Sequence, residues 1–73
     1  MYLIIEKIDF VNISPSFNVV SYSKDKDLAD RYAQCKRDEA NEQGKENYSY
    51  DVVFFPNHTF SLEDVKRLDK DVN

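Results

Sequence analysis

The sequence predicts a single α+β domain of ββαβα order: a three-stranded antiparallel sheet, a long helix packed on one face, and a short C-terminal helix. Three observations lead to this prediction. Apolar side chains recur with helical spacing between residues 23 and 44, and apolar runs typical of strands lie on both sides. The 73 residues also contain only one glycine and two prolines, which leaves little room for linkers. We therefore treat residues 1–73 as one domain.

The first two elements are predicted strands. Residues 2–5 are apolar on both alternating faces, which is typical of a strand covered on two sides. A looser alternation continues to Val11. Residues 12–16 form a predicted turn around Pro15, and residues 17–22 form the second strand. The two strands should form a hairpin.

A long helix is predicted over residues 23–44. Ser23 or Asp25 can cap its first free amides, and Gly44 suits the left-handed position just past a helix end. Six apolar positions form a stripe about 140° wide on a helical wheel. They are Leu28, Ala29, Tyr32, Ala33, Cys35 and Ala40. Because most of these side chains are small, the helix can lie close to the sheet.

The third strand is predicted over residues 48–55, before Pro56. Its first half alternates between apolar and polar side chains, and its second half is apolar on both faces. A right-handed helical crossover places this strand beside the first, so the predicted strand order is 2-1-3. The doubly apolar first strand then lies in the centre, as its composition requires.

The C-terminal residues predict a short second helix. Residues 61–64 resemble a capping box, and Phe60 and Val65 have the spacing of a hydrophobic staple. A short apolar stripe continues through Leu68 to Val72. This pattern indicates about two to three helical turns that fray after Lys70.

The charge distribution disfavours nucleic acid as a partner. The net charge is −4, and each of the segments 1–23, 24–43, 44–60 and 61–73 sums to −1. No segment is basic enough to bind a phosphate backbone. Lys and Arg also alternate with the carboxylates, whereas a mimic of DNA would be expected to gather carboxylates on one face.

The sequence favours a reducing compartment and no membrane segment. Cys35 is the only cysteine, so no internal disulfide can form. The first ten residues lack a basic leader, and Glu6 interrupts their apolar run. We expect a cytoplasmic protein that does not associate with a membrane.

No motif predicts catalysis, a cofactor, a metal or a small-molecule substrate. His58 and Cys35 lie on separate predicted elements, and Cys35 falls on the apolar stripe, where it should be buried. Glu6 and Asp51 interrupt apolar strands. They either share one sheet face and form a polar spot, or mark solvent-facing positions, and the second reading is favoured. We therefore expect no enzymatic activity.

Aromatic and apolar strand residues are the candidate interaction surface. The main helix can cover only one sheet face, so residues left exposed by the two helices could bind another protein or a second copy. The alternative is that these are half-buried sheet residues with no such role. The candidates are Tyr2, Ile4, Tyr22, Tyr48, Tyr50, Val52 and Phe54.

One resemblance accompanies these patterns. Two strands, a helix that opens Ser-Lys-Asp-Lys-Asp at Ser23 and continues Leu-Ala-Asp-Arg-Tyr-Ala from Leu28, and a third strand follow in order. Over about residues 2–56 this resembles the small uncharacterised ββαβ-type accessory proteins of tailed bacteriophages. The resemblance implies a role in binding or inhibiting a host protein and transfers no functional residue.

Together these patterns predict a small non-enzymatic cytoplasmic accessory protein that acts by protein–protein binding. A phage-encoded modulator or inhibitor of a host or defence protein fits this description. One alternative is a homodimeric structural or regulatory component. The other is a nucleic-acid-associated factor or DNA mimic, which the charge pattern disfavours.

Overall fold

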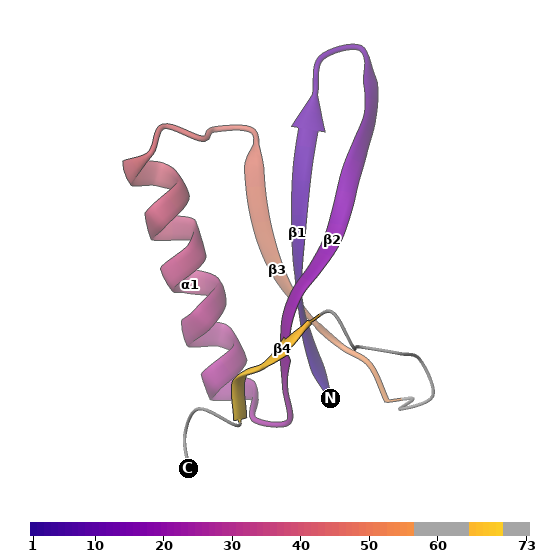
Figure 1. Ribbon diagram of the computed structural model, residues 1–73, viewed down its shortest axis with the longest axis vertical. Coiled ribbons are helices and arrows are strands. Elements are labelled where there is room, and N and C mark those ends of the chain that lie inside the picture. Colours follow the sequence, from indigo (N-terminus) through magenta and orange to yellow (C-terminus); the bar gives the residue numbers. More distant parts are fainter. Residues whose placement is uncertain (57–64, 70–73) are drawn as a thin grey trace.

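The computed structural model describes residues 1–56 and 65–69, in which four strands and one helix follow in the order ββαββ (Figure 1). The elements are β1 (Tyr2–Phe10), β2 (Ile13–Ser23), α1 (Lys26–Glu42), β3 (Tyr48–Phe54) and β4 (Lys66–Arg67). The strands form one mixed sheet of order β3-β1-β2-β4. The α+β class is confirmed, while the number of strands and the C-terminal element differ from the prediction.

β1 is the central strand of the three long ones, as predicted. It pairs antiparallel with β2 on one side and with β3 on the other. Leu3 and Ile4 are 6% and 0% exposed. β2 and β3 flank both residues within the sheet, and α1 covers the face on which Ile4 lies. The doubly apolar start of the strand therefore occupies the position that its composition favours.

The hairpin between β1 and β2 is tighter than predicted. Phe10 pairs with Ile13, so the turn consists of Val11 and Asn12 rather than residues 12–16. Asn12 has φ 67°, a left-handed conformation that asparagine tolerates better than most residues. Pro15 lies inside β2, where it has no cross-strand partner in β1. A proline at such a strand position loses no ladder hydrogen bond, and β2 therefore begins four residues earlier than predicted.

α1 begins and ends near its predicted caps. Asp25 is the N-cap, and its carboxylate accepts hydrogen bonds from the amides of Asp27 (2.9 Å) and Leu28 (3.3 Å). Gly44 follows the helix with φ 70°, the left-handed conformation that favours glycine. The helix packs against β3 and β1 on one face of the sheet (Figure 1).

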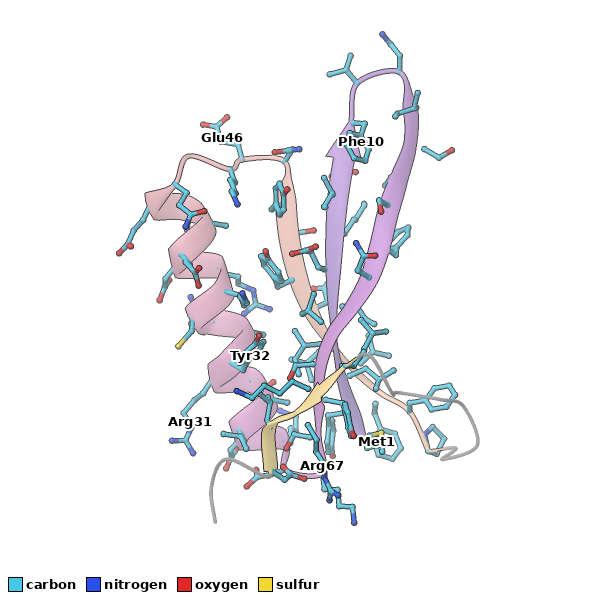
Figure 2. All side chains as sticks on the ribbon, viewed as in Figure 1. Met1, Phe10, Arg31, Tyr32, Glu46 and Arg67 are labelled. Atoms are coloured by element: carbon cyan, nitrogen blue, oxygen red, sulfur yellow. The ribbon has the colours of Figure 1, made fainter. Side chains whose placement is uncertain are left out.

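The three alanines, rather than the larger apolar residues, lie at the centre of the helix–sheet contact. Ala29, Ala33 and Ala40 are buried, whereas Cys35 is exposed, so the prediction of a buried cysteine is wrong. Cys35 lies about 140° around the helix from the centre of the alanine stripe. Small side chains let the helix axis come close to the sheet, which moves Cys35 out of the contact. Tyr32 lies at the flank and faces the sheet, as Figure 2 shows.

The core is small and built between α1, the sheet and the C-terminal residues. Its fully packed members are Ile4, Ala29, Ala33 and Leu68. Partly buried side chains pack around them: Tyr2, Val20, Leu28, Tyr32 and Val52. Leu68 belongs to the predicted C-terminal stripe, and it reaches the core from the 3₁₀ turn that directly follows β4.

The predicted C-terminal helix is wrong at residues 66–67, which form β4. This strand pairs parallel with Ser21 and Tyr22 at the edge of β2. The hydroxyl of Ser21, which is fully buried, donates a hydrogen bond to the carbonyl of Lys66 (2.7 Å). Pairing with an open strand edge and burial of Leu68 replace the local helical preference. The predicted caps at residues 60–64 and the end at residues 70–72 lie outside the described residues.

Asp69 fixes this segment beside the start of α1. Its carboxylate accepts hydrogen bonds from the hydroxyl of Ser23, which is fully buried, and from the amide of Lys24 (2.9 Å). Nε of Arg67 lies 3.6 Å from the same carboxylate. The Ser23 hydroxyl, followed by the Lys24 amide and Arg67, holds the pKa of Asp69 below its usual value against the opposing effect of burial. We call residues 66–69 the C-terminal clasp.

Candidate functional site

The β1–β2 hairpin extends beyond the rest of the molecule (Figure 1). β3 pairs with β1 only as far as Ile8, opposite Tyr48, and the two strands of the hairpin continue past this point. The molecule is elongated as a result, with extents of 38 × 26 × 19 Å and a radius of gyration of 12.9 Å. A compact chain of this length would have a radius of gyration of about 11 Å. We call residues 10–17 the arm.

Most of the exposed large apolar side chains of the described residues are on the arm. Val11 is 87% exposed, Ile13 66%, Phe17 62% and Phe10 46%. Phe10 pairs with Ile13 and therefore shares a sheet face with it, whereas Phe17 pairs with Lys7 on the opposite face. Figure 2 shows Phe10 on the hairpin well above the level of Tyr32. The arm is therefore apolar on both of its faces.

Polar contacts hold the base of the arm in place. The amide of Asp9 donates to the carbonyl of Asn47 (2.9 Å), and the side-chain amide of Asn47 donates to the carbonyl of Asp9 (3.0 Å). On the sheet face that carries Phe17, Nζ of Lys7 lies 6.0 Å from the centre of the Phe17 ring and 3.6 Å from the carboxylate of Asp9. A free two-stranded ribbon is marginally stable in water, so these contacts and the continuity with β1 keep the arm extended.

The outer edge of β2 carries backbone groups that point away from the sheet. The Asp9–Asn47 hydrogen bond belongs to the β1–β3 ladder, so the odd-numbered residues of β1 direct their N–H and C=O groups to β3. Phe17 and Val19 lie opposite odd-numbered residues of β1. Their own N–H and C=O groups therefore point outward. Such groups can accept an added strand.

This free edge has defined limits. β4 covers β2 at Ser21 and Tyr22, and at the other end Pro15 has no amide hydrogen to offer. Between these limits no described residue pairs with the edge, and we call residues 15–19 the β2 free edge. Residues 10–23 also contain no charged side chain. Charges are a common means of keeping an edge strand from pairing with another chain, and this edge lacks them.

A polar cavity of about 120 Å³ lies between the end of α1 and the sheet. Its lining residues are Glu6, Lys36, Glu39, Ala40, Gln43, Lys45, Tyr48 and Tyr50. The Tyr50 hydroxyl donates a hydrogen bond to the Glu6 carboxylate (2.8 Å). Burial, and then this hydrogen bond, raise the pKa of Tyr50 to about 12, so the hydroxyl stays protonated at neutral pH. The volume is well below the several hundred Å³ typical of small-molecule sites.

The candidate interface residues from the sequence lie mainly on the face that α1 covers. Ile4 is 0% and Tyr50 6% exposed, which removes both from the candidate surface. Tyr2 and Val52 pack partly against the core beneath α1. Tyr22 and Tyr48 are half-buried, and Phe54 is exposed. The alternation of side chains within each strand predicts correctly that most of these residues share one face. It does not predict that this is the face that α1 covers.

The candidates from the sequence do not include the arm. Ile13 falls in the predicted turn of residues 12–16, whereas Phe10, Val11 and Phe17 lie on predicted strands and were not identified as exposed. One signal for them is the run of residues 10–23 without a charged side chain. In the structure Val11 and Asn12 form the turn, so Ile13 and Pro15 belong to β2.

The polar candidates do not form a joint site. Glu6 pairs with Tyr50 on the α1 side of the sheet, whereas Asp51 pairs with Ile5 and is exposed on the other side. A polar spot shared by Glu6 and Asp51 is therefore excluded by the register. His58 lies outside the described residues, so the structure does not place it relative to Cys35.

Two further kinds of site are absent from residues 1–56 and 65–69. This part of the chain has no cluster of three or more His, Cys, Asp or Glu side chains arranged to hold a metal ion. Its helix also lacks the length and apolar character that crossing a membrane requires.

Comparisons with known proteins add no relative. The sequence matches no protein-family model. Neither a curated protein nor a solved structure matches the chain.

Proposed function

We propose that this chain is a small non-enzymatic protein-binding module whose arm contacts the partner. The observation that carries this proposal is the exposure of Phe10, Val11 and Ile13 on the part of the hairpin that extends beyond β3. Phe17, at the base of the arm, is also exposed. The largest apolar patch of a monomer is commonly about 300–600 Å² in area and is often functional. The arm carries most of the exposed large apolar side chains of the described residues, and residues 10–23 contain no charged side chain.

The free energy of burying apolar side chains favours binding of a partner to the arm. Complete burial of a Val, Ile or Phe side chain contributes about 1.5–3 kcal/mol. Val11, Ile13 and Phe17 contribute little of this in the free protein because they are more than half exposed. A partner that covers the arm would gain this contribution. Since both faces of the arm are apolar, a partner groove that encloses the hairpin fits better than a flat surface.

The resemblance to accessory proteins of tailed bacteriophages supports a biological setting for this module. In that setting the chain is a cytoplasmic modulator or inhibitor of a host or defence protein. Nucleic acid is a poor partner for the same surface, because residues 10–23 contain no lysine or arginine to contact phosphates.

Affinity capture from a bacterial lysate with matched variants tests the proposal. The test protein is the double variant Val11→Ser/Ile13→Ser, and the control is Val53→Ser, which changes an exposed valine (45%) on the sheet outside the arm. We expect the wild type and Val53→Ser to retain the same partner. The arm variant should retain it at least tenfold less, while its circular dichroism spectrum stays that of the wild type.

Two outcomes would contradict the proposal. One is a lysate in which the wild type retains no protein above background. The other is a partner that the folded arm variant retains as well as the wild type does.

A further inference from the structure

We propose that two copies of this chain associate by antiparallel pairing of their β2 free edges. This contact goes beyond the proposed function, because it uses backbone groups of residues 15–19, whereas the contact with the partner uses exposed side chains at the tip of the arm, such as Val11 and Ile13. A two-fold axis perpendicular to the sheet makes two identical edges pair antiparallel and contact each other with the same residues. The result would be a continuous sheet across both copies.

The geometry of the edge limits where the copies can overlap. β4 occupies β2 at Ser21 and Tyr22, so a second strand has room only beside residues 15–19. Antiparallel pairing in this window brings the outward amide of Phe17 to the carbonyl of Pro15 in the other copy, twice by symmetry. The missing amide hydrogen of Pro15 leaves no donor unpaired in this arrangement. Ser16 of one copy then lies opposite Ser16 of the other.

The charge distribution favours a second copy as the occupant. The chain carries a net charge of −4, and all of its charged residues lie outside residues 10–23. Contact through the uncharged arms keeps the two charged bodies at opposite ends of an assembly built from molecules 38 Å long. Charges separated by more than about 8 Å are largely screened at physiological ionic strength. Like-charge repulsion therefore opposes this association only weakly.

The short overlap sets the expected strength. Interfaces that bury less than about 1,200 Å² in total are usually weak or transient. Pairing over about five residues, with the exposed side chains of Ile13 and Phe17 added, falls in this class. We therefore expect a weak, transient dimer that forms only at high protein concentration.

Sedimentation equilibrium of the full chain between about 10 µM and 1 mM tests the association. The test variant is Phe17→Lys, which places a charge on the free edge, and the control is Val53→Lys on the same sheet face outside the arm. The wild type and the control should shift from monomer towards dimer across this range. In Phe17→Lys the dissociation constant should rise at least tenfold. A wild type that stays monomeric at 1 mM, or a Phe17→Lys variant that associates like the wild type, would overturn the proposal.

Disulfide trapping tests the register independently of stability. In a Cys35→Ser background, Ser16→Cys should form a disulfide-linked dimer under mild oxidation at least tenfold faster than Ser49→Cys, an exposed position on β3. Equal rates at the two positions would refute edge pairing near residue 16. If the wild type stays monomeric but still captures a lysate protein through its arm, the self-association is refuted and the proposed function stands.

Discussion

The replacement of Ser23 by alanine tests how strongly the C-terminal clasp is attached to the fold. Ser23 is fully buried, and its hydroxyl makes two hydrogen bonds. It donates to the Asp69 carboxylate and accepts from the amide of Asp25 (2.9 Å), the residue that caps α1. The substitution removes both bonds and introduces no larger group, so its cost reflects the hydrogen bonds alone.

The expected destabilisation follows from the two bonds. A hydrogen bond to a charged group contributes about 1.5–3 kcal/mol and a neutral one about 0.5–1.5 kcal/mol. Asp69 retains its bond to the Lys24 amide and its contact with Arg67, which offsets part of the loss. We therefore expect the free energy of unfolding to fall by about 2 kcal/mol. The total for a chain of this length is about 4–11 kcal/mol, so the loss is a large share.

Urea unfolding followed by circular dichroism measures this change. With a slope of about 1 kcal/mol per molar urea, the midpoint should move down by about 2 M. The control is Ser49→Ala on the exposed side of β3, which should change the midpoint only slightly. A loss below about 0.5 kcal/mol for Ser23→Ala would refute the view that these hydrogen bonds hold the clasp.

The same pair of proteins should also differ in pH dependence. The pKa of Asp69 is lowered in the folded state, so its stabilising effect is complete above the unfolded value near 3.8 and is lost as pH falls below it. Ser23 is the largest cause of that lowered pKa. The stability difference between the wild type and Ser23→Ala should therefore be largest near neutral pH and should narrow in acid. A difference that stays constant down to acid unfolding would contradict this coupling.

Three further predictions concern the sheet and the helix. Arg37→Gln removes the two hydrogen bonds from the guanidinium to the Tyr50 carbonyl (3.0 and 2.7 Å) and should cost about 1–2 kcal/mol in a urea melt, whereas Arg31→Gln, at an exposed position, should cost almost nothing. In an ultraviolet absorbance titration, one of the five tyrosines should ionise near pH 12, and this transition should be missing in Tyr50→Phe. Because folding raises the pKa of Tyr50, the protonated hydroxyl stabilises the fold fully below pH 10, and this stabilisation is lost as pH rises towards 12. Asn12→Gly should leave thermal stability almost unchanged, and Asn12→Val should lower it by about 1 kcal/mol because a β-branched residue resists a φ of 67°; equal stability of the two would show that the turn adopts another conformation.

The central part of the fold was predictable from the sequence for identifiable physical reasons. Residues 2–5 are apolar on both faces, a pattern that favours the interior of a sheet, and β1 lies between β3 and β2. The caps of α1 were also recognisable, because Asp25 and Gly44 have the local chemistry that helix ends need. In these elements local preference and tertiary packing favour the same outcome.

The rest depended on contacts between distant residues. Residues 66–67 have a helical pattern, yet they pair as a strand with the open edge of β2, and the Ser21 hydroxyl bonds to Lys66. The Ser23 hydroxyl bonds to Asp69, two residues after this strand. In the sequence these serines only weaken the apolar pattern of β2, and nothing marks them as buried partners. The exposure of Cys35 likewise depended on how α1 turns its alanines to the sheet. The arm was not predicted because the turn is shorter than expected: with Asn12 in the left-handed conformation, β2 already begins at Ile13.

The clasp also determines how the native state opens. Ser21 and Lys66 are 45 positions apart, so the clasp is held by contacts between residues that are distant in the sequence. These contacts are few, since β4 has only two residues and Leu68 is the only buried apolar group of the clasp. We therefore expect β4 to be released more easily than the long strands β1, β2 and β3. Each release exposes the edge of β2 at Ser21 and Tyr22, and it lengthens the segment of β2 backbone with which another strand can pair.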